Sequence, residues 1–250
     1  MVKNIKKKVP DAYGEMLRFQ LETNESVAEI VEREDRYMDT GSVAGLYFLE
    51  PKKWPREELS ALKHAKGRVL DVGGGAGRHS LYLQDRGLDL TAIDSSPGAI
   101  GVCKARGVHR AIVRPIAEVS RFKDASFDTI IMMGNNFGLL GSLNNGKTIL
   151  KEFHRIMSSK AIIIAATRDP YKTNRRVHLD YHRFNKRRGR MSGQIRMRIR
   201  FAKSIGPWFD YLLVSPKEMK MVIDKTGWQI REILSRDESG YFTIIEKSPA

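Results

Sequence analysis

The sequence contains a single cysteine, Cys103, and no long apolar segment. One cysteine excludes an internal disulfide framework and any metal site built from several cysteines. A membrane-spanning helix would need about 20 consecutive apolar residues, and no such run is present. The first eight residues carry four lysines, but Pro10 and Asp11 follow where the apolar part of a secretory signal would have to lie. We therefore expect a soluble, cytoplasmic protein in which Cys103 serves in packing.

Acidic residues are scarce in one segment, and this scarcity accounts for most of the net charge of +15. Residues 168–203 contain thirteen Lys and Arg but only two Asp. Outside this segment and the first eight residues, the chain has 27 basic and 27 acidic residues. Three interpretations stay open. The segment could bind the phosphates and bases of a nucleic acid, it could form a lid whose arginines pair with an anionic substrate, or it could be a solvated surface.

Apolar strand-like segments alternate with helical patterns from residue 68 onward. This alternation is typical of a parallel sheet covered by helices on both faces. We predict an α/β fold with a doubly wound, mostly parallel, seven-stranded sheet. The expected strands are residues 69–72, 88–93, 111–113, 127–133, 161–166, 228–234 and 241–245. Between these strands, the first expected helix ends near residue 86. The other expected helices span residues 97–105, 146–157 and 217–226.

Two parts of the chain do not follow this alternation. Residues 1–66 are predicted to form an N-terminal helical extension. Residues 11–38 are expected to be helical with a break or cap at Asn24 to Ser26, and another helix is expected from Pro55 to about His64. Residues 67–250 would form the main domain, with a basic insertion at 168–214. Within the insertion, residues 194–201 alternate apolar and polar side chains, which predicts one strand of a hairpin. Its apolar face is expected to pack on the protein and its arginine face to point outward.

A glycine-rich turn follows the first predicted strand, at Asp71 to Gly77. Glycine permits positive φ and lets a ligand lie close to the backbone, and the N–H groups at the start of the next helix favour an anionic group. The dinucleotide pattern would need a third glycine at position 78, which is Arg78, and no Gly-Lys-Ser/Thr follows. A nicotinamide-dependent oxidoreductase and a phosphate-binding loop are therefore disfavoured.

The turn and the acidic residue Asp94, 17 residues after Gly77, resemble the class I S-adenosylmethionine-dependent methyltransferases. The resemblance covers residues 69–166 and the final helix and two strands. It implies S-adenosylmethionine as the cofactor, with Asp71 near its methionine part and Asp94 on its ribose. An ionised carboxylate can accept hydrogen bonds from both hydroxyls of a ribose. The residues that the resemblance assigns to the cofactor are Asp71, Gly73, Gly74, Gly75, Gly77, Asp94, Ser95, Ile116, Ala117, Met133 and Gly134.

The adenine end differs from the family pattern. The family often has Asp-Ala where this chain has Ile116-Ala117. We expect Ile116 to pack on the adenine face and Ala117 to offer its backbone.

Residues after the fourth and fifth predicted strands are the candidates for substrate binding and catalysis. In methyltransferases that act on nucleic-acid adenine or on protein glutamine, the corresponding residues follow the pattern Asn/Asp-Pro-Pro-Tyr/Phe. Residues 134–138 lie at this place but lack the two prolines, so these two substrate classes are not supported. Asn135 and Asn136 could also simply form a turn. The substrate candidates are Asn135, Asn136, Arg168, Tyr171, Tyr181 and Trp208. The candidates for a general base are His178, His182, Asp169 and Asp210.

His178 and His182 are four residues apart and could share a helix face, but no nearby third ligand completes a metal site, so no metal is expected. The sequence thus predicts methyl transfer from S-adenosylmethionine to an O or N nucleophile of a small molecule, for which an anionic group would suit the arginines. Methylation of structured RNA and cofactor binding without catalysis are the alternatives. The acceptor and the oligomeric state are not predicted.

Overall fold

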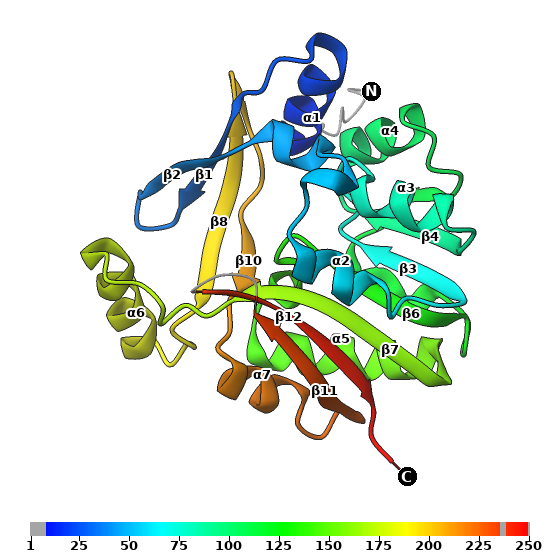
Figure 1. Cartoon of the computed structure of the whole chain (residues 1–250). Coiled ribbons are helices and arrows are strands. Elements are labelled where there is room, and N and C mark those ends of the chain that lie inside the picture. Colours follow the sequence, from blue (N-terminus) through cyan, green and yellow to red (C-terminus); the bar gives the residue numbers. More distant parts are fainter. Residues whose placement is uncertain (1–8, 236–238, 250) are drawn as a thin grey trace, which may run out of the picture.

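The computed structural model describes residues 9–235 and 239–249, so the four N-terminal lysines lie outside the described residues. Its larger sheet has seven strands in the order β11-β12-β7-β6-β3-β4-β5 (Figure 1). The strands β3 to β7 are parallel, while β12 pairs antiparallel with both β7 and β11. The predicted fold class is therefore confirmed. The strand bounds are β3 (Arg68–Val72), β4 (Asp89–Asp94), β5 (Ala111–Val113), β6 (Phe127–Met132), β7 (Met157–Arg168), β11 (Trp228–Ser235) and β12 (Gly240–Lys247).

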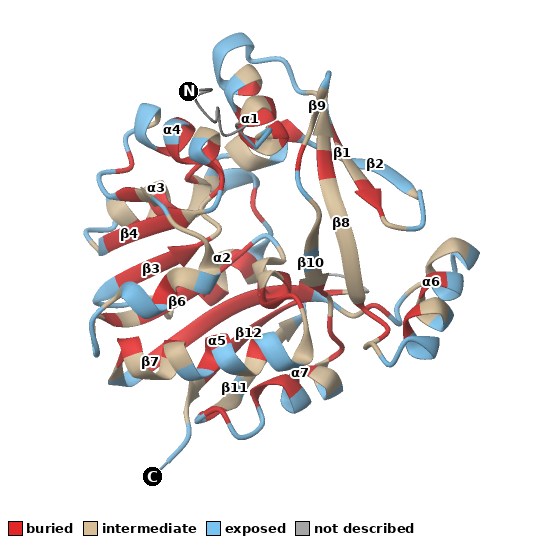
Figure 2. Cartoon of the chain, turned by 180° about the vertical axis from the view of Figure 1, so that it is seen from behind, coloured by how far each residue is buried: buried red, intermediate tan, exposed pale blue. Residues whose placement is uncertain are grey.

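Helices cover both faces of this sheet, and alternate residues of each strand point to opposite faces. Leu70, Ile130 and Ile163 belong to one core cluster, which includes residues of α5 (Leu143–Ile156) and α7 (Pro216–Ile223). Val69, Ile131 and Ile164 belong to the second cluster. That cluster includes residues of α2 (Arg56–Leu62), α3 (Arg78–Asp85) and α4 (Pro97–Ala105). Figure 2 shows β3, β6 and β7 buried along most of their length, so the sheet is a rigid base for the loops at its carboxyl edge.

A second sheet joins the N-terminal segment to the basic insertion. Its strand order is β10-β8-β1-β2, and β9 also pairs with β8. The predicted hairpin is confirmed, because β8 (Gln194–Phe201) pairs antiparallel with β10 (Phe209–Leu212). On its other side β8 pairs with β1 (Ala28–Arg33), which in turn pairs with β2 (Met38–Val43). A short strand, β9 (Ser204–Ile205), lies between β8 and β10 in the chain.

The predicted break at Asn24 to Ser26 is confirmed, but the prediction that the residues after it up to 38 are helical is wrong. Helix α1 (Ala12–Thr23) ends at Asn24, which adopts the left-handed conformation with φ of 57°. Residues 28–33 and 38–43 then form β1 and β2. The β-branched side chains of Val27, Ile30 and Val31 favour an extended chain, and pairing with β8 supplies hydrogen bonds that a local pattern does not reveal. The domain boundary at residue 66 remains a prediction. The pairing of β1 with β8 joins the segments on its two sides.

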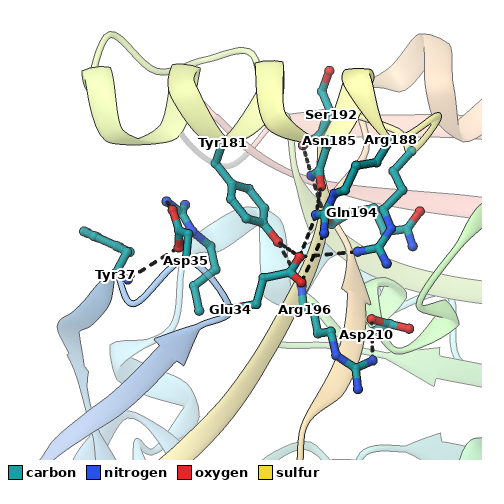
Figure 3. A network of polar contacts seen from close by, with 12 residues as sticks. Glu34, Asp35, Tyr37, Tyr181, Asn185, Arg188, Ser192, Gln194, Arg196 and Asp210 are labelled. Carbon is teal, nitrogen blue, oxygen red and sulfur yellow. Dashed lines mark hydrogen bonds and ion pairs between the residues drawn. The ribbon is translucent and has the colours of Figure 1, made fainter.

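Helix α6 (Arg176–Arg187) lies against one end of the second sheet (Figure 3). Glu34, just after β1, accepts hydrogen bonds from the Tyr181 hydroxyl at 2.9 Å and from the Arg188 guanidinium at 2.7 Å. Asn185 is fully buried, and its amide donates to the carbonyl oxygens of Ser192 and Gln194. These contacts fix α6 to the sheet. Within the described residues, no helix is long and apolar enough to cross a membrane.

Candidate cofactor and substrate site

The glycine turn after β3 adopts the conformation that its composition predicts. Gly73, Gly75 and Gly77 have φ of 78°, 54° and 78°, a region that side chains disfavour. The N–H groups of Gly73 and Gly74 donate to the carbonyl oxygen of Ile93 at 2.9 and 3.0 Å, which ties the turn to β4. A Cβ atom on Gly75 would lie 2.7 Å from the hydroxyl oxygen of Tyr13. Glycine is therefore required at position 75, both because of its positive φ and because the Tyr13 hydroxyl lies close to it.

Asp94 ends β4 beside this turn. One carboxylate oxygen accepts from the N–H of Gly75 at 3.0 Å, and the other accepts from the N–H of Ser96 at 2.9 Å. Burial is the main cause that raises the pKa of Asp94, to about 6, while the two backbone hydrogen bonds oppose it. The side chain is thus ionised at neutral pH and held in one orientation. Each oxygen keeps a lone pair that can accept from a ribose hydroxyl.

Asp71 and Gly77 do not line the cavity, although the resemblance assigned both to the cofactor. The Asp71 carboxylate is buried under the turn and accepts from the Ser80 hydroxyl at 2.6 Å. A Cβ atom on Gly77 would lie 2.8 Å from a methyl carbon of Val108 and 3.2 Å from the sulfur of Cys103. The structure therefore places Asp71 where it joins β3 to α3, and Gly77 where helix α4 packs closely.

A cavity of about 1880 Å³ lies between the carboxyl ends of the parallel strands and the second sheet. This is the edge where open α/β sheets bind ligands. The rest of the predicted cofactor residues line it, together with both asparagines after β6. These residues are Gly73, Gly74, Gly75, Asp94, Ser95, Ile116, Ala117, Met133, Gly134, Asn135 and Asn136.

The two asparagines use their polar groups mainly within the protein. The Asn136 amide donates to the carbonyl oxygens of Val72 and Gly73 at 3.0 and 2.8 Å, which holds the glycine turn. Asn135 has a positive φ of 70°, and its carbonyl oxygen accepts from the Tyr211 hydroxyl at 2.6 Å. Its side-chain oxygen is buried and has no hydrogen-bond partner in the part of the chain that the structure describes. Asn135 thus keeps a buried side-chain acceptor unused, whereas the amide nitrogen of Asn136 is engaged by the glycine turn.

The second sheet forms the opposite wall of the cavity. Its inward side chains there are mostly apolar, namely Val31, Ile195, Met197, Ile199 and Phe209. Apolar residues of the predicted strand therefore face the site, as expected of a cover. The arginines of β8 take the other face, where Arg198 and Arg200 bind Glu32 at 2.8 and 3.0 Å. Arg196 pairs with Asp210 at 3.3 Å.

The candidates from the insertion divide into two groups. Arg168, Asp169, His178, Tyr181, His182 and Asp210 line the cavity. Tyr171 and Trp208 do not. Tyr171 donates to Glu218 at 2.7 Å, and Trp208 lies beneath the Arg198 guanidinium, 4.4 Å from its ring centroid.

His178 and His182 project from α6 at its cavity side. Burial lowers the pKa of both imidazoles, and the nearby charge of Arg33 lowers it further. Both rings are therefore neutral at pH 7, which suits a general base. Among the described residues, no three His, Cys, Asp or Glu side chains are grouped as a metal site would require.

The N-terminal segment contributes many cavity residues that were not predicted, and three of these lie next to one another. They are Tyr13 of α1, Glu29 of β1 and Tyr47 of the short 3-10 helix Ala44–Phe48. The Tyr47 hydroxyl donates to Glu29 at 2.9 Å, and the rings of Tyr13 and Tyr47 meet edge to face at 5.5 Å. No sequence motif marks these residues. Only the pairing of β1 with β8 brings Glu29 to the site.

Part of this chain matches a known family. Residues 70–165 match a family described as a methyltransferase domain. Over 154 residues the chain is 26% identical to a glycine/sarcosine N-methyltransferase of Aphanothece halophytica, covering 58% of this chain and 55% of that protein. Over 138 residues it is 31% identical to a demethylmenaquinone methyltransferase of Renibacterium salmoninarum, covering 53% and 55%. The matches thus span about half the length of these curated relatives.

A solved structure extends the likeness to nearly the whole chain. A SAM-dependent methyltransferase of Bacteroides fragilis, solved with S-adenosyl-L-homocysteine, has a TM-score of 0.81 and 25% identity, and 96% of each chain is covered. These comparisons confirm the predicted class. The chain has the fold of the class I S-adenosylmethionine-dependent methyltransferases, its residues 70–165 match a methyltransferase domain, and S-adenosylmethionine is the cofactor of this class.

Proposed function

We propose that the protein transfers the methyl group of S-adenosylmethionine to an O or N nucleophile of a small molecule bound between the two sheets. The observation that supports this is the single cavity shared by the glycine turn, Asp94 and the apolar face of β8. Pockets for one small ligand typically measure about 300–1000 Å³. A cavity of about 1880 Å³ has room for the cofactor and a second molecule.

The residues around the cavity suit methyl transfer. When bound, the cofactor supplies an activated methyl group on a sulfonium, so the protein mainly has to hold a nucleophile in line with it. The glycine turn and Asp94 would hold the cofactor from one side, with Ile116 against its adenine. Val31, Met197 and Phe209 would exclude water from the opposite side. A desolvated, positioned nucleophile reacts faster than one in water.

Charge pairing in the insertion supports a small substrate over RNA. Glu32 binds Arg198 and Arg200, and Glu34 binds Arg188 and Arg190. Arginines that are engaged in this way are poorly available for the phosphate contacts that dominate RNA binding. The names of the relatives also point to small acceptors, namely glycine or sarcosine in one case and demethylmenaquinone in the other. A cytoplasmic location stays a prediction.

Two measurements test the proposal. Calorimetry should show that S-adenosylmethionine binds and that NADH does not. Labelled-methyl transfer into a cell extract, with and without ribonuclease, should then place the label in small solutes. Label that ribonuclease releases from RNA would favour the alternative of RNA methylation. Cofactor binding with no label in any fraction would mean that the protein binds S-adenosylmethionine without catalysis.

A further inference from the structure

We propose that Glu29 binds and deprotonates the nucleophile of the substrate, and that this nucleophile is an amine. The inference rests on the proposed function and adds the chemical class of the acceptor. It depends on one unusual feature of the cavity, which is a buried carboxylate without a cationic partner.

Glu29 differs from the two other glutamates of its segment. Its side chain lines the cavity and the residue is only 9% exposed. Glu32 and Glu34 each bind two arginines, whereas Glu29 forms no ion pair with any described residue. One of its oxygens accepts from the Tyr47 hydroxyl, and the other has no hydrogen bond within the described residues. A buried charge is costly unless a partner compensates it. A cationic ligand would supply the partner that this carboxylate lacks among the described residues.

Tyr47 contacts this carboxylate directly, and Tyr13 and Tyr211 lie within reach of its charge. The charge of Glu29 contributes to the raised pKa of Tyr13, Tyr47 and Tyr211, so all three hydroxyls lie within its field. Tyr13 stands over Gly75, and Tyr211 donates to the carbonyl of Asn135. Contacts thus lead from Glu29 through Tyr47 and Tyr13 to the turn after β3, and all of these residues line the same cavity. A ligand bound at the carboxyl edge of the sheet lies next to this turn and within the same cavity as Glu29.

An ammonium group fits this environment better than other nucleophiles. It would pair with the free carboxylate oxygen and pack against the electron-rich faces of the tyrosine rings. A neutral hydroxyl would leave the charge of Glu29 uncompensated. A carboxylate or phosphate nucleophile would be repelled by it.

The reaction then proceeds in two steps. Burial raises the pKa of Glu29, which favours its neutral form, so the carboxylate takes one proton from the bound ammonium. The amine nitrogen uses the freed electron pair to form a bond to the methyl carbon. The bond between sulfur and that carbon breaks, its electron pair stays on sulfur, and S-adenosylhomocysteine and a methylated ammonium result. The proton on Glu29 leaves to solvent when the product leaves.

The other charged and titratable groups near Glu29 do not replace it. Asp39 of β2 adds negative charge, which also raises the pKa of Glu29, and Asp94 is bound to the glycine turn. Arg33 lies on the same strand, but its guanidinium is held by both carboxylate oxygens of Asp35 at 2.7 Å. The remaining neighbours, Tyr13, Tyr47 and Tyr211, are neutral at physiological pH because burial raises their pKa.

The nature of the methylated atom tests the inference without a known acceptor. S-adenosylmethionine labelled with ¹³C in its methyl group is incubated with the protein and the small-molecule fraction of a cell extract. The carbon chemical shift of the product then distinguishes N-methyl from O-, S- or C-methyl groups. We expect an N-methyl product. A product methylated on oxygen, sulfur or carbon would overturn the amine assignment and leave the proposed function intact, whereas no ¹³C in any small molecule would overturn the proposed function itself.

A variant series on the same product tests Glu29. Glu29→Gln keeps an acceptor for Tyr47 but removes the charge, so it should lower the transfer rate at least about 100-fold, as expected for loss of a general base. Its residual rate should rise with pH as free amine replaces ammonium, and its affinity for S-adenosylhomocysteine should equal that of the wild type. Glu25→Gln, at an exposed position, is the matched control. Wild-type turnover in Glu29→Gln would overturn the assignment, and so would a residual rate without this pH dependence.

Discussion

A carboxylate oxygen of Asp94 accepts a hydrogen bond from the backbone N–H of Gly75 at 3.0 Å. This bond joins the end of β4 to the turn after β3, the two places where the sequence pattern predicts cofactor contacts. The orientation of Asp94 is therefore set before any ligand binds. A preorganised acceptor loses little entropy on binding, so changes at Asp94 should appear directly in cofactor affinity.

Replacement of Asp94 by Asn should weaken S-adenosylmethionine binding by about 10- to 100-fold. Hydrogen bonds to charged groups contribute about 1.5–3 kcal/mol, and the amide is neutral and can accept through only one atom. Asp89→Asn is the matched control, because Asp89 begins the same strand but is exposed, and among the described residues it pairs only with Arg110. Calorimetry measures both. Equal losses in the two variants would contradict a role of Asp94 in the site.

Cofactor affinity should depend on pH through the same residue. Burial raises the pKa of Asp94 to about 6, so its carboxylate is protonated below that pH and loses an acceptor. Affinity should be constant above about pH 7 and fall as the pH drops through 6. The Asp94→Asn variant should lack this fall in affinity. If its affinity depended on pH as that of the wild type does, Asp94 would be ruled out as the titrating group.

The same raised pKa has the opposite consequence for the free protein. The folded state holds the Asp94 proton more tightly than the unfolded chain, so this residue's contribution to stability decreases as the pH rises from about 4 to 6. The bound cofactor restores stability at neutral pH by mass action. The thermal shift on adding S-adenosylhomocysteine should therefore be larger at pH 7.5 than at pH 5.5, values that bracket a pKa of about 6.

Gly75→Ala should abolish tight cofactor binding, whereas Gly87→Ala should not. Both glycines have positive φ, 54° and 80°, so each variant should lose about 1–2 kcal/mol of stability. They differ in their surroundings, because a Cβ atom on Gly87 meets nothing within 4 Å, while one on Gly75 reaches the Tyr13 hydroxyl. Unfolding measurements report the stability lost through backbone strain, and calorimetry reports the cofactor affinity lost through obstruction by the added Cβ atom. Normal binding by Gly75→Ala would refute the close approach.

Glu34→Gln should loosen helix α6 without unfolding the domain. Glu34 accepts from Tyr181, Arg188 and Arg190, and the Arg188 hydrogen bond is the main cause of its lowered pKa. Hydrogen exchange measured by mass spectrometry should become roughly tenfold faster in residues 176–187, equivalent to about 1.4 kcal/mol.

Asp180→Asn is the control for this experiment. Asp180 lies on α6, and among the described residues it pairs only with Arg176 and Arg183 of the same helix. Its replacement should change exchange much less than Glu34→Gln does. Comparable exchange in the two variants would show that Glu34 does not hold the helix.

Local signals predicted the seven-stranded sheet well. Pro97 at the start of α4 and the apolar run at residues 161–166 located their elements, because proline and apolar periodicity act over a few residues. Helix α1 and the break after it were also found, but the residues beyond the break were wrongly predicted as helical, since the tendency of residues 28–43 to form strands depends on partners elsewhere. Asp71 and Gly77 show a related limit. A motif names the residues that a turn requires, but it does not say which of them face the ligand.

The sequence by itself determined β3, the glycine turn after it and the acidic residue Asp94 at the end of β4. With these features it determined the cofactor class. Each of these depends on backbone conformation or on neighbours within one βαβ unit, which the chain encodes locally. The tertiary structure decided what faces the cofactor site. The antiparallel pairing of β1 with β8 joins segments that are far apart in the chain, and it brings Glu29 and the apolar side chains of β8 onto one wall. Such long-range pairing is set by hydrogen bonds and packing that no local pattern contains.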